Sequence, residues 1–361
     1  MDTSGNKGEW SEVYALFKLL ADGELCTGDA DMNKIEGLIY PIITIFRDNI
    51  FYNRDNHNSN IILKTSDGTT ISTIPIIQFQ KNAELLLTKI QKGKNAFQIP
   101  EITEFRKETY VENIKAPSSD KADIVIIVHD ERAGFDPKLS FSIKSQLGSP
   151  SSLLNAGKNT NFIYRLSKDF DQTTINEING TDSQQKRMDL INKYGAKLHF
   201  VGIQPSSNNK KMFECNLTNI DTSLPLILSY MIFYYYQASA TSGIKELCAI
   251  LNKQNPLGFD QSYQHTYYET KIKRFLVDTA LGMKPASLWN GRYEANGGYL
   301  VVKEDGDIVC YHIYNKNEFE DYLFHNTKME SASRSRHDYG YVYCQDGHLF
   351  IKLNLQIRFK K

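Results

Sequence analysis

The sequence has few cysteines, and they are not spaced as a framework. Its 361 residues include five cysteines, an odd number, at scattered positions and with no Cys-x-x-Cys pair. This excludes a disulfide-stapled fold and a zinc knuckle. Its eight histidines form no His-x-x-x-His pair either. Neither G-x-G-x-x-G nor G-x-x-x-x-G-K-[ST] occurs, which excludes a dinucleotide cofactor and ATP-driven chemistry.

Long apolar segments are also missing. The longest apolar run, 224–236, contains Pro225 and Ser229 and is shorter than the ~18 residues that a membrane-spanning helix needs. The first ten residues have no basic segment followed by an apolar one, so we expect no secretory signal. We therefore expect a soluble, cytoplasmic protein without a membrane partner. Its 41% apolar content is enough for one large domain or two ordinary ones.

The net charge is zero, but it is unevenly distributed. Residues 1–60 carry five Lys/Arg and ten Asp/Glu, a net charge of −5. Residues 138–211 carry eleven and five, a net of +6, and residues 327–361 carry seven and three, a net of +4. Such a distribution suits a metal-dependent enzyme acting on a polyanion, because carboxylates hold cations while Lys/Arg contact phosphates.

The apolar spacing predicts both helices and strands. Helices are expected at Lys7–Leu20, Lys34–Arg47, Glu84–Gln91, Ser223–Gln237, Ile244–Leu251 and Tyr267–Leu281, with a loop at 21–33. Strands are expected at Asp123–His129, Leu139–Lys144 and Lys197–Ile203, and hairpins at 49–73, 297–313 and 340–359. We therefore predict an α/β (α+β) fold with a mixed central sheet, a helical segment and a C-terminal β-rich module. We divide the chain into a core at 1–220 and a helical and β-rich module at 221–361, with packing of the two as one unit as the alternative.

The two central strands carry the candidate chemistry. Asp123 opens the first strand, and Lys144 lies on the polar side of the second, where Ser140 and Ser142 alternate with apolar residues. Their spacing suits neighbouring strands. A carboxylate that holds Mg²⁺ and a lysine that orients or deprotonates water are the minimum for phosphodiester hydrolysis. A strand-end aspartate and an exposed strand lysine also occur in many sheets without any such role.

The pattern resembles the PD-(D/E)xK nuclease superfamily, in which an Asp opens one strand and acid-x-Lys lies on the next. Here the second element is Ser142-Ile143-Lys144, so a serine replaces the usual acid. The segment from Lys7 to Glu12 is similar to the K-G-x-x-x-E of archaeal Holliday-junction resolvases, whose glutamate joins the metal site. That resemblance implies Glu12 as a ligand of Mg²⁺ together with Asp123; Glu9 and Glu36 remain alternatives.

Longer stretches narrow the resemblance to the HpaII family of type II restriction endonucleases. They are NKGEWSEVYALFKLL, GDADMNKIEGLIYPI, FSIKSQLGSPSSLLNAGKNTNF, LGMKPASLWNG and KLNLQIRF, and together they run from Asn6 to Phe359. The resemblance implies a restriction-endonuclease-like α/β/α core and Mg²⁺-dependent double-strand cleavage at a short palindrome, with CCGG as the expected target. It also implies a cognate cytosine DNA methyltransferase as the system partner.

Two further regions offer DNA contacts. Segment 145–162 follows the catalytic strand directly and is rich in hydrogen-bonding side chains. Its candidates for phosphate contact are Gln146, Ser149, Ser151, Asn155, Lys158 and Asn161. Near the C-terminus, Arg334 and Arg336 would point the same way from an extended segment and could each read guanine O6/N7, and Arg358 adds a third candidate. A solvated loop or contacts with phosphates alone would explain the same arginines.

The sequence therefore predicts a type II restriction endonuclease, with a homodimer favoured because a palindromic site matches a two-fold axis. Two other hypotheses stay open at this point. One is a structure-specific junction or repair nuclease on the same core. The other is a catalytically silent DNA-binding regulator, which the serine at position 142 favours.

Overall fold

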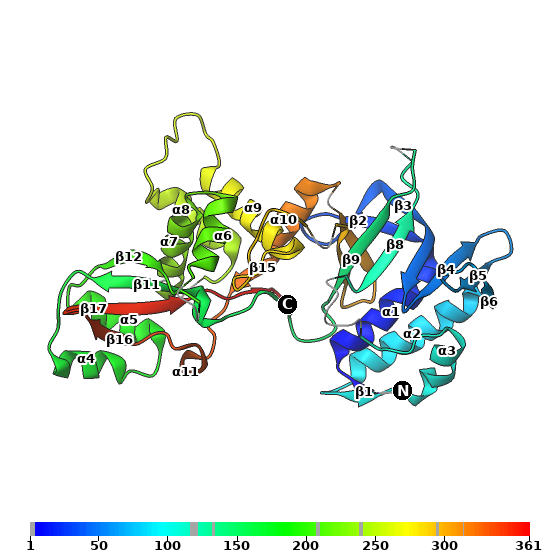
Figure 1. The fold of residues 1–361 in the computed structure, drawn as a ribbon, viewed down its shortest axis with the longest axis horizontal. Coiled ribbons are helices and arrows are strands. Elements are labelled where there is room, and N and C mark those ends of the chain that lie inside the picture. Colours follow the sequence, from blue (N-terminus) through cyan, green and yellow to red (C-terminus); the bar gives the residue numbers. More distant parts are fainter. Residues whose placement is uncertain are drawn as a thin grey trace. The chain divides into compact units, whose positions relative to one another are not determined.

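The computed structural model describes residues 4–115, 122–131, 134–206, 210–237, 241–293, 296–312 and 314–361. Ile313, the last residue of one predicted hairpin, lies outside these ranges. The chain divides into two compact units (Figure 1). The first unit comprises Met1–Ser151 and Tyr293–Tyr322, with Lys361; the second comprises Ser152–Arg292 and Leu323–Lys360. The contacts therefore do not divide the chain at residue 220, because a later β hairpin joins the sheet of the first unit.

The first unit is built on a mixed sheet, as the predicted α/β class requires. Its strands are β2 (Glu24–Gly28), β3 (Lys34–Arg47), β4 (Ile50–Asp55), β5 (Asn60–Lys64), β6 (Thr70–Pro75), β8 (Ile124–Val128), β9 (Lys138–Ser145), β13 (Gly298–Val302) and β14 (Ile308–His312). Their order is β2-β14-β13-β9-β8-β3-β4-β5-β6, and β2 also pairs with β3. Six strands thus close into a barrel-like ring, a closure that the sequence did not indicate.

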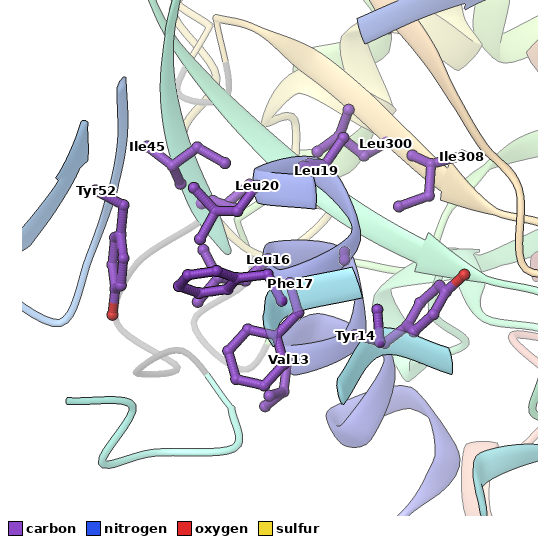
Figure 2. Close-up of a cluster of buried hydrophobic side chains, with 14 of the residues drawn as sticks. Val13, Tyr14, Leu16, Phe17, Leu19, Leu20, Ile45, Tyr52, Leu300 and Ile308 are labelled. Carbon is purple, nitrogen blue, oxygen red and sulfur yellow. The ribbon is translucent and has the colours of Figure 1, made fainter. Parts of the chain in front are cut away.

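Helix α1 (Lys7–Asp22) carries the centre of the first unit's core. Asn6 and Glu9 form a capping box at its start, and Gly23 ends it in the left-handed conformation, φ 79°. Figure 2 shows Val13, Leu16, Phe17 and Leu20 of α1 among buried side chains of the sheet. Helix α2 (Ile76–Lys92) packs against α1, with Phe79 5.8 Å from Phe17 between ring centroids. The predicted helices at 7–20 and 84–91 are confirmed, the second as part of a longer one.

The shorter elements of the first unit complete its edge. They are β1 (Ser4–Gly5), β7 (Phe97–Gln98), η1 (Pro100–Ile102) and α3 (Thr103–Glu108). Helix α10 (Lys316–Asn326) begins in the first unit and ends in the second, and the sequence did not predict it.

The predicted helix at 34–47 is wrong, because this segment is strand β3. Its apolar residues recur at intervals of three and four, which imitates a helix. Ile39 and Ile43 are apolar although they are exposed, and they complete that spacing, while a register shift between Ile42 and Thr44 also breaks the strand's alternation. The predicted loop at 21–33 likewise contains strand β2, which pairs with β3.

The second unit combines a four-stranded antiparallel sheet with helices. The sheet has the order β12-β11-β17-β16, from β11 (Asn161–Leu166), β12 (Leu198–Ile203), β16 (Val342–Gln345) and β17 (His348–Asn354). A smaller sheet joins β10 (Ser152–Leu154), β15 (Thr327–Met329) and β18 (Ile357–Phe359). The helices are η2 (Lys158–Thr160), α4 (Gln172–Asn179), α5 (Gln184–Lys193), α6 (Met212–Ile220), α7 (Leu224–Gln237), α8 (Ile244–Gln254), α9 (Tyr267–Leu281) and α11 (Arg334–His337).

Most sequence predictions for this unit are confirmed. The three helices expected between 221 and 282 appear as α7, α8 and α9, and the Asp346-Gly347 turn joins β16 to β17. No helix among the described residues is long and apolar enough to cross a membrane. All five cysteines are free.

Candidate active site

The central feature of the first unit is a hydrogen-bonded chain that links Asp123, Ser142 and Lys144. Asp123 directly precedes β8, and its backbone N–H donates to the carbonyl of Phe141 on β9, at 2.8 Å. Strands β8 and β9 are antiparallel neighbours, with Ile124 opposite Phe141. The predicted adjacency of the two strands is confirmed, and it brings the aspartate beside the Ser-x-Lys segment.

One oxygen of Asp123 accepts two hydrogen bonds. The Ser142 hydroxyl donates to Oδ2 at 3.1 Å, and the backbone N–H of Ile143 donates to the same atom at 2.6 Å. The Lys144 ammonium donates to Ser142 Oγ at 2.9 Å. Ser142 therefore connects the carboxylate to the lysine, and the second oxygen of Asp123 takes no part in these bonds.

Lys144 is half-buried between the Tyr299 ring and acidic neighbours. Burial lowers its pKa, and the charges of Asp123 and Glu12 act in the opposite direction. The amine consequently loses its proton more readily than an exposed lysine does. That property suits a group that accepts a proton from water.

Glu12 lies on α1 at the same site. Its residue is 8% exposed, and its Oε2 lies 3.5 Å from Nη2 of Arg47 on β3. The neighbouring Ser11 hydroxyl lies 2.8 Å from that of Ser145 on β9, which fixes α1 against the strand that carries Lys144. Helix and strand thus place Glu12 and Asp123 near one lysine.

The alternative glutamates occupy other positions. Glu9 accepts a hydrogen bond from the backbone N–H of Asn6 at 2.9 Å and so belongs to the helix cap. Glu36 is exposed at the beginning of β3. Of the three candidates, only Glu12 acts electrostatically on Lys144.

The oxygen donors at this site fit a hard cation. Two carboxylates and a hydroxyl are ligand types that Mg²⁺ accepts, and Mg²⁺ needs only one or two protein carboxylates when water and phosphate complete its shell. Within the described ranges, no group of three or more Asp, Glu, His or Cys side chains gathers as a metal site. The donor set is therefore too small for a closed structural metal centre.

Two residues of the site were not found from the sequence. The ring of Tyr299 lies under the Lys144 ammonium, 4.8 Å from nitrogen to centroid. Arg47 is 4% exposed, contacts Glu12, and donates from Nη2 to the carbonyl of Ile114 at 3.1 Å. Both come from segments far from β9 in the sequence, and no local pattern marks either one.

The predicted DNA contacts of segment 145–162 differ in their exposure to solvent. Ser149, Asn155 and Lys158 are exposed, while Gln146 and Ser151 are half-buried. Asn161 is fully buried, unlike the other five, and its contact with DNA stays a prediction. Its amide donates to Gln204 Oε1 and to the carbonyl of His337, both at 2.9 Å. These bonds satisfy a polar group that is buried inside the second unit.

The C-terminal arginines do not form an extended pair. Arg334 and Arg336 lie on the short helix α11, so they do not point the same way as they would from an extended segment, and their contacts with DNA stay predictions. Arg334 donates from Nη2 to the carbonyl of Asp182 at 2.6 Å, whereas Arg336 is exposed. Arg358 on β18 forms an ion pair with Glu330 at 2.8 Å.

Comparison with known proteins adds a family relationship. A family model described as HpaII restriction endonuclease matches residues 6–359. The type II restriction enzyme HpaII of Haemophilus parainfluenzae is 48% identical over 363 residues, covering 99% of this chain and 98% of that protein. No solved structure matches the chain.

Proposed function

This chain belongs to the HpaII restriction endonuclease family, and we propose from that premise that it cleaves double-stranded DNA within a CCGG site. It is a type II restriction enzyme, a site-specific deoxyribonuclease. The relationship covers nearly the whole chain, which supports a shared target as well as a shared reaction. A palindromic target would be matched by a two-fold homodimer.

We place the reaction at Glu12, Asp123, Ser142 and Lys144. The observation that carries this assignment is the hydrogen-bonded chain from Asp123 through Ser142 to Lys144, with Glu12 acting on the same lysine. An acid before one strand, a Ser-x-Lys on the next and a glutamate from the first helix support a restriction-endonuclease-like core. That core would include the barrel-like ring of the first unit.

Asp123 and Glu12 would hold Mg²⁺. When bound, this ion stabilises the negative charge that develops on the scissile phosphate. Asp123 is prepared for this role because Ser142 and the Ile143 amide both bond to its Oδ2 and so fix the orientation of the carboxylate. Arg47 restrains the Glu12 carboxylate from the side of β3.

Lys144 would act on the attacking water. Its lowered pKa makes the ammonium easier to deprotonate to an amine that can accept a proton from water, and the bond to Ser142 Oγ orients its nitrogen. Ser142 cannot replace the missing acid as a charged ligand. Its hydroxyl instead orients the two charged groups on either side.

The decisive experiment compares Lys144→Ala with Lys138→Ala on plasmid DNA that carries CCGG sites. Lys138 lies on the same strand and is exposed, so it is a matched control. We expect Lys144→Ala to lose cleavage while its affinity for CCGG duplex in Ca²⁺ stays within about threefold, because base contacts lie elsewhere. Lys138→Ala should cut normally. Cleavage by Lys144→Ala within about tenfold of normal would remove this lysine from the mechanism.

The same digest tests the other hypotheses. A junction nuclease would give no discrete fragments from linear duplex, and a silent regulator would bind DNA without cutting it. We further propose that a cytosine methyltransferase protects the CCGG sites of host DNA in the cytoplasm. Resistance of CCGG plasmids methylated in vitro would support that pairing.

A further inference from the structure

Helices α6 and α7 cover one face of the four-stranded sheet in the second unit. The other face carries basic and aromatic side chains. On the covered face, Tyr164 donates to the carbonyl of Ser229 on α7 at 2.6 Å, and Phe162 lies 6.4 Å from Phe213 on α6. The opposite side, here called the outer sheet face, is formed by nine residues. Strand pairing places Ile163, Arg165, His199, Tyr343, Gln345, His348, Phe350 and Lys352 on it, and Val201, at the register shift in β12, is the ninth.

The strand register arranges the centre of this face in one row across all four strands. His199 is opposite Arg165, Arg165 is opposite Phe350, and Phe350 is opposite Tyr343. Since directly paired residues share a face, the row reads basic, basic, aromatic, aromatic. Arg165 and His199 are exposed, and Val201 is 52% exposed beside them.

Contacts within the face hold its cations against aromatic rings. The rings of Tyr343 and Phe350 stack at 5.8 Å, and Lys352 lies 5.3 Å from the Tyr343 centroid. Nη2 of Arg165 lies 3.0 Å from Nδ1 of His348. Cations held in this way lose less side-chain freedom when they meet an anion.

Further positive charge lies at the β16 edge. Arg187 lies 4.3 Å from the centroid of Tyr341, a ring that is 41% exposed, and Arg334 lies 5.9 Å from the same ring. Arg187 donates to the backbone carbonyls of Asn179, Thr181 and Gly340, which do not neutralise its charge. Arg187 is only 2% exposed, and Lys352 forms an ion pair with Asp338 at 2.8 Å. The face therefore combines aromatic surface with one exposed arginine, Arg165, which no carboxylate of the described residues neutralises.

We propose that the outer sheet face contacts the phosphate backbone of the duplex substrate, with Arg165 as the central phosphate contact. The proposal rests on the DNA-cleaving function proposed above and adds a surface to it. Charge complementarity selects the occupant, since duplex DNA carries a dense row of negative charge and Arg and Lys account for much of its phosphate binding. The face would position the substrate without reading its sequence.

The test measures duplex affinity by fluorescence anisotropy, in Ca²⁺, for CCGG and scrambled duplexes at several salt concentrations. Arg165→Ala should weaken both duplexes alike, by about fivefold or more at low salt. It should also reduce the slope of log K against log salt by about 0.9, the value for one lost phosphate contact. Arg165→Lys should restore most of the slope. Lys253→Ala, an exposed lysine on α8 of the same unit, should leave both quantities unchanged.

The outcomes separate this proposal from the function on which it rests. If the unaltered protein neither binds nor cuts any duplex, the proposed function fails before the variants are considered. If the unaltered protein binds and Arg165→Ala keeps its affinity and salt slope, the surface alone is overturned. A loss confined to the CCGG duplex would overturn backbone contact.

Discussion

The ammonium of Lys144 lies 4.8 Å from the centre of the Tyr299 ring, and strand pairing fixes that distance. In the parallel pairing of β13 with β9, Tyr299 is opposite Ser142, so the ring and the Ser-x-Lys side chains share a face. Tyr299 is 3% exposed, and Phe319 packs edge-on against it at 5.4 Å. The ring is therefore a rigid support for the lysine, which makes Tyr299 a positioning residue.

Two substitutions of Tyr299 should distinguish the contribution of its ring from that of its hydroxyl group. Tyr299→Leu should lower kcat by roughly 2- to 30-fold, the equivalent of a cation–π contact of about 0.5–2 kcal/mol, with KM unchanged. Tyr299→Phe should restore kcat because it keeps the ring. Steady-state cleavage of a CCGG duplex measures both constants. Equal losses in the two variants would assign the effect to the hydroxyl instead.

The second prediction concerns the two glutamates of helix α1, Glu9 and Glu12. Glu12→Gln should lower kcat by about 100-fold or more, because a carboxylate that holds the cation is lost. Glu9→Ala should cut normally yet lower the free energy of unfolding by about 1 kcal/mol, since Glu9 serves the helix cap. Urea unfolding and plasmid digestion of both variants measure these effects. Normal cleavage by Glu12→Gln would exclude Glu12 as a ligand.

Much of the fold was predictable where local chemistry decides it. Asn6, Glu9 and Gly23 mark the ends of α1, and the Asp305-Gly306 and Asp346-Gly347 turns mark two hairpins. Strand β3 was not predictable, because exposed apolar residues such as Ile39 and Ile43 give it a helix-like spacing. The closure of six strands into a ring depends on pairings between distant segments, which no local pattern encodes.

In the candidate site, too, the residues that are close in sequence could be predicted and those brought in by long-range pairing could not. Asp123, Ser142 and Lys144 lie on adjacent strands of one continuous segment, so their spacing predicts their contact. Tyr299 reaches them only because β13 pairs with β9, a choice made by tertiary packing. The helix that carries Arg334 and Arg336 could not be predicted, because a one-turn helix is too short to show a repeating pattern of apolar residues.

His312 predicts how stability depends on pH. The residue is 1% exposed, and its Nδ1 accepts the backbone N–H of Tyr314 at 2.9 Å. Its buried Nε2 has no hydrogen-bond partner among the residues that the structure describes. Burial lowers the pKa of His312 to about 4, against the opposing charge of Asp130. The unfolded state therefore binds the extra proton first as pH falls. The free energy of unfolding should therefore be highest above pH ~6.5 and should fall by up to about 3 kcal/mol as the pH is lowered toward ~4.

The matching experiment is urea unfolding at several pH values for His312→Gln. Its slope of unfolding free energy against pH between about 4 and 6.5 should be shallower than that of the unaltered protein. His57→Gln, on the exposed turn between β4 and β5, is the control and should keep the original slope. An unchanged slope in His312→Gln would assign the acid sensitivity to other groups.

The last prediction concerns Arg334 and Arg336, which the structure assigns to different tasks. Arg334 donates to the Asp182 carbonyl and packs on Tyr341, so Arg334→Ala should lower the free energy of unfolding by about 1 kcal/mol. Arg336 is exposed on α11 and remains available to a guanine edge. A bidentate guanine contact contributes roughly 1–3 kcal/mol of discrimination. Arg336→Ala should therefore lose about 5- to 150-fold in affinity for CCGG duplex while scrambled duplex changes little. Competition between the two duplexes at two salt concentrations measures this directly. Equal losses on both, with a salt slope smaller by about one, would instead make Arg336 a phosphate contact.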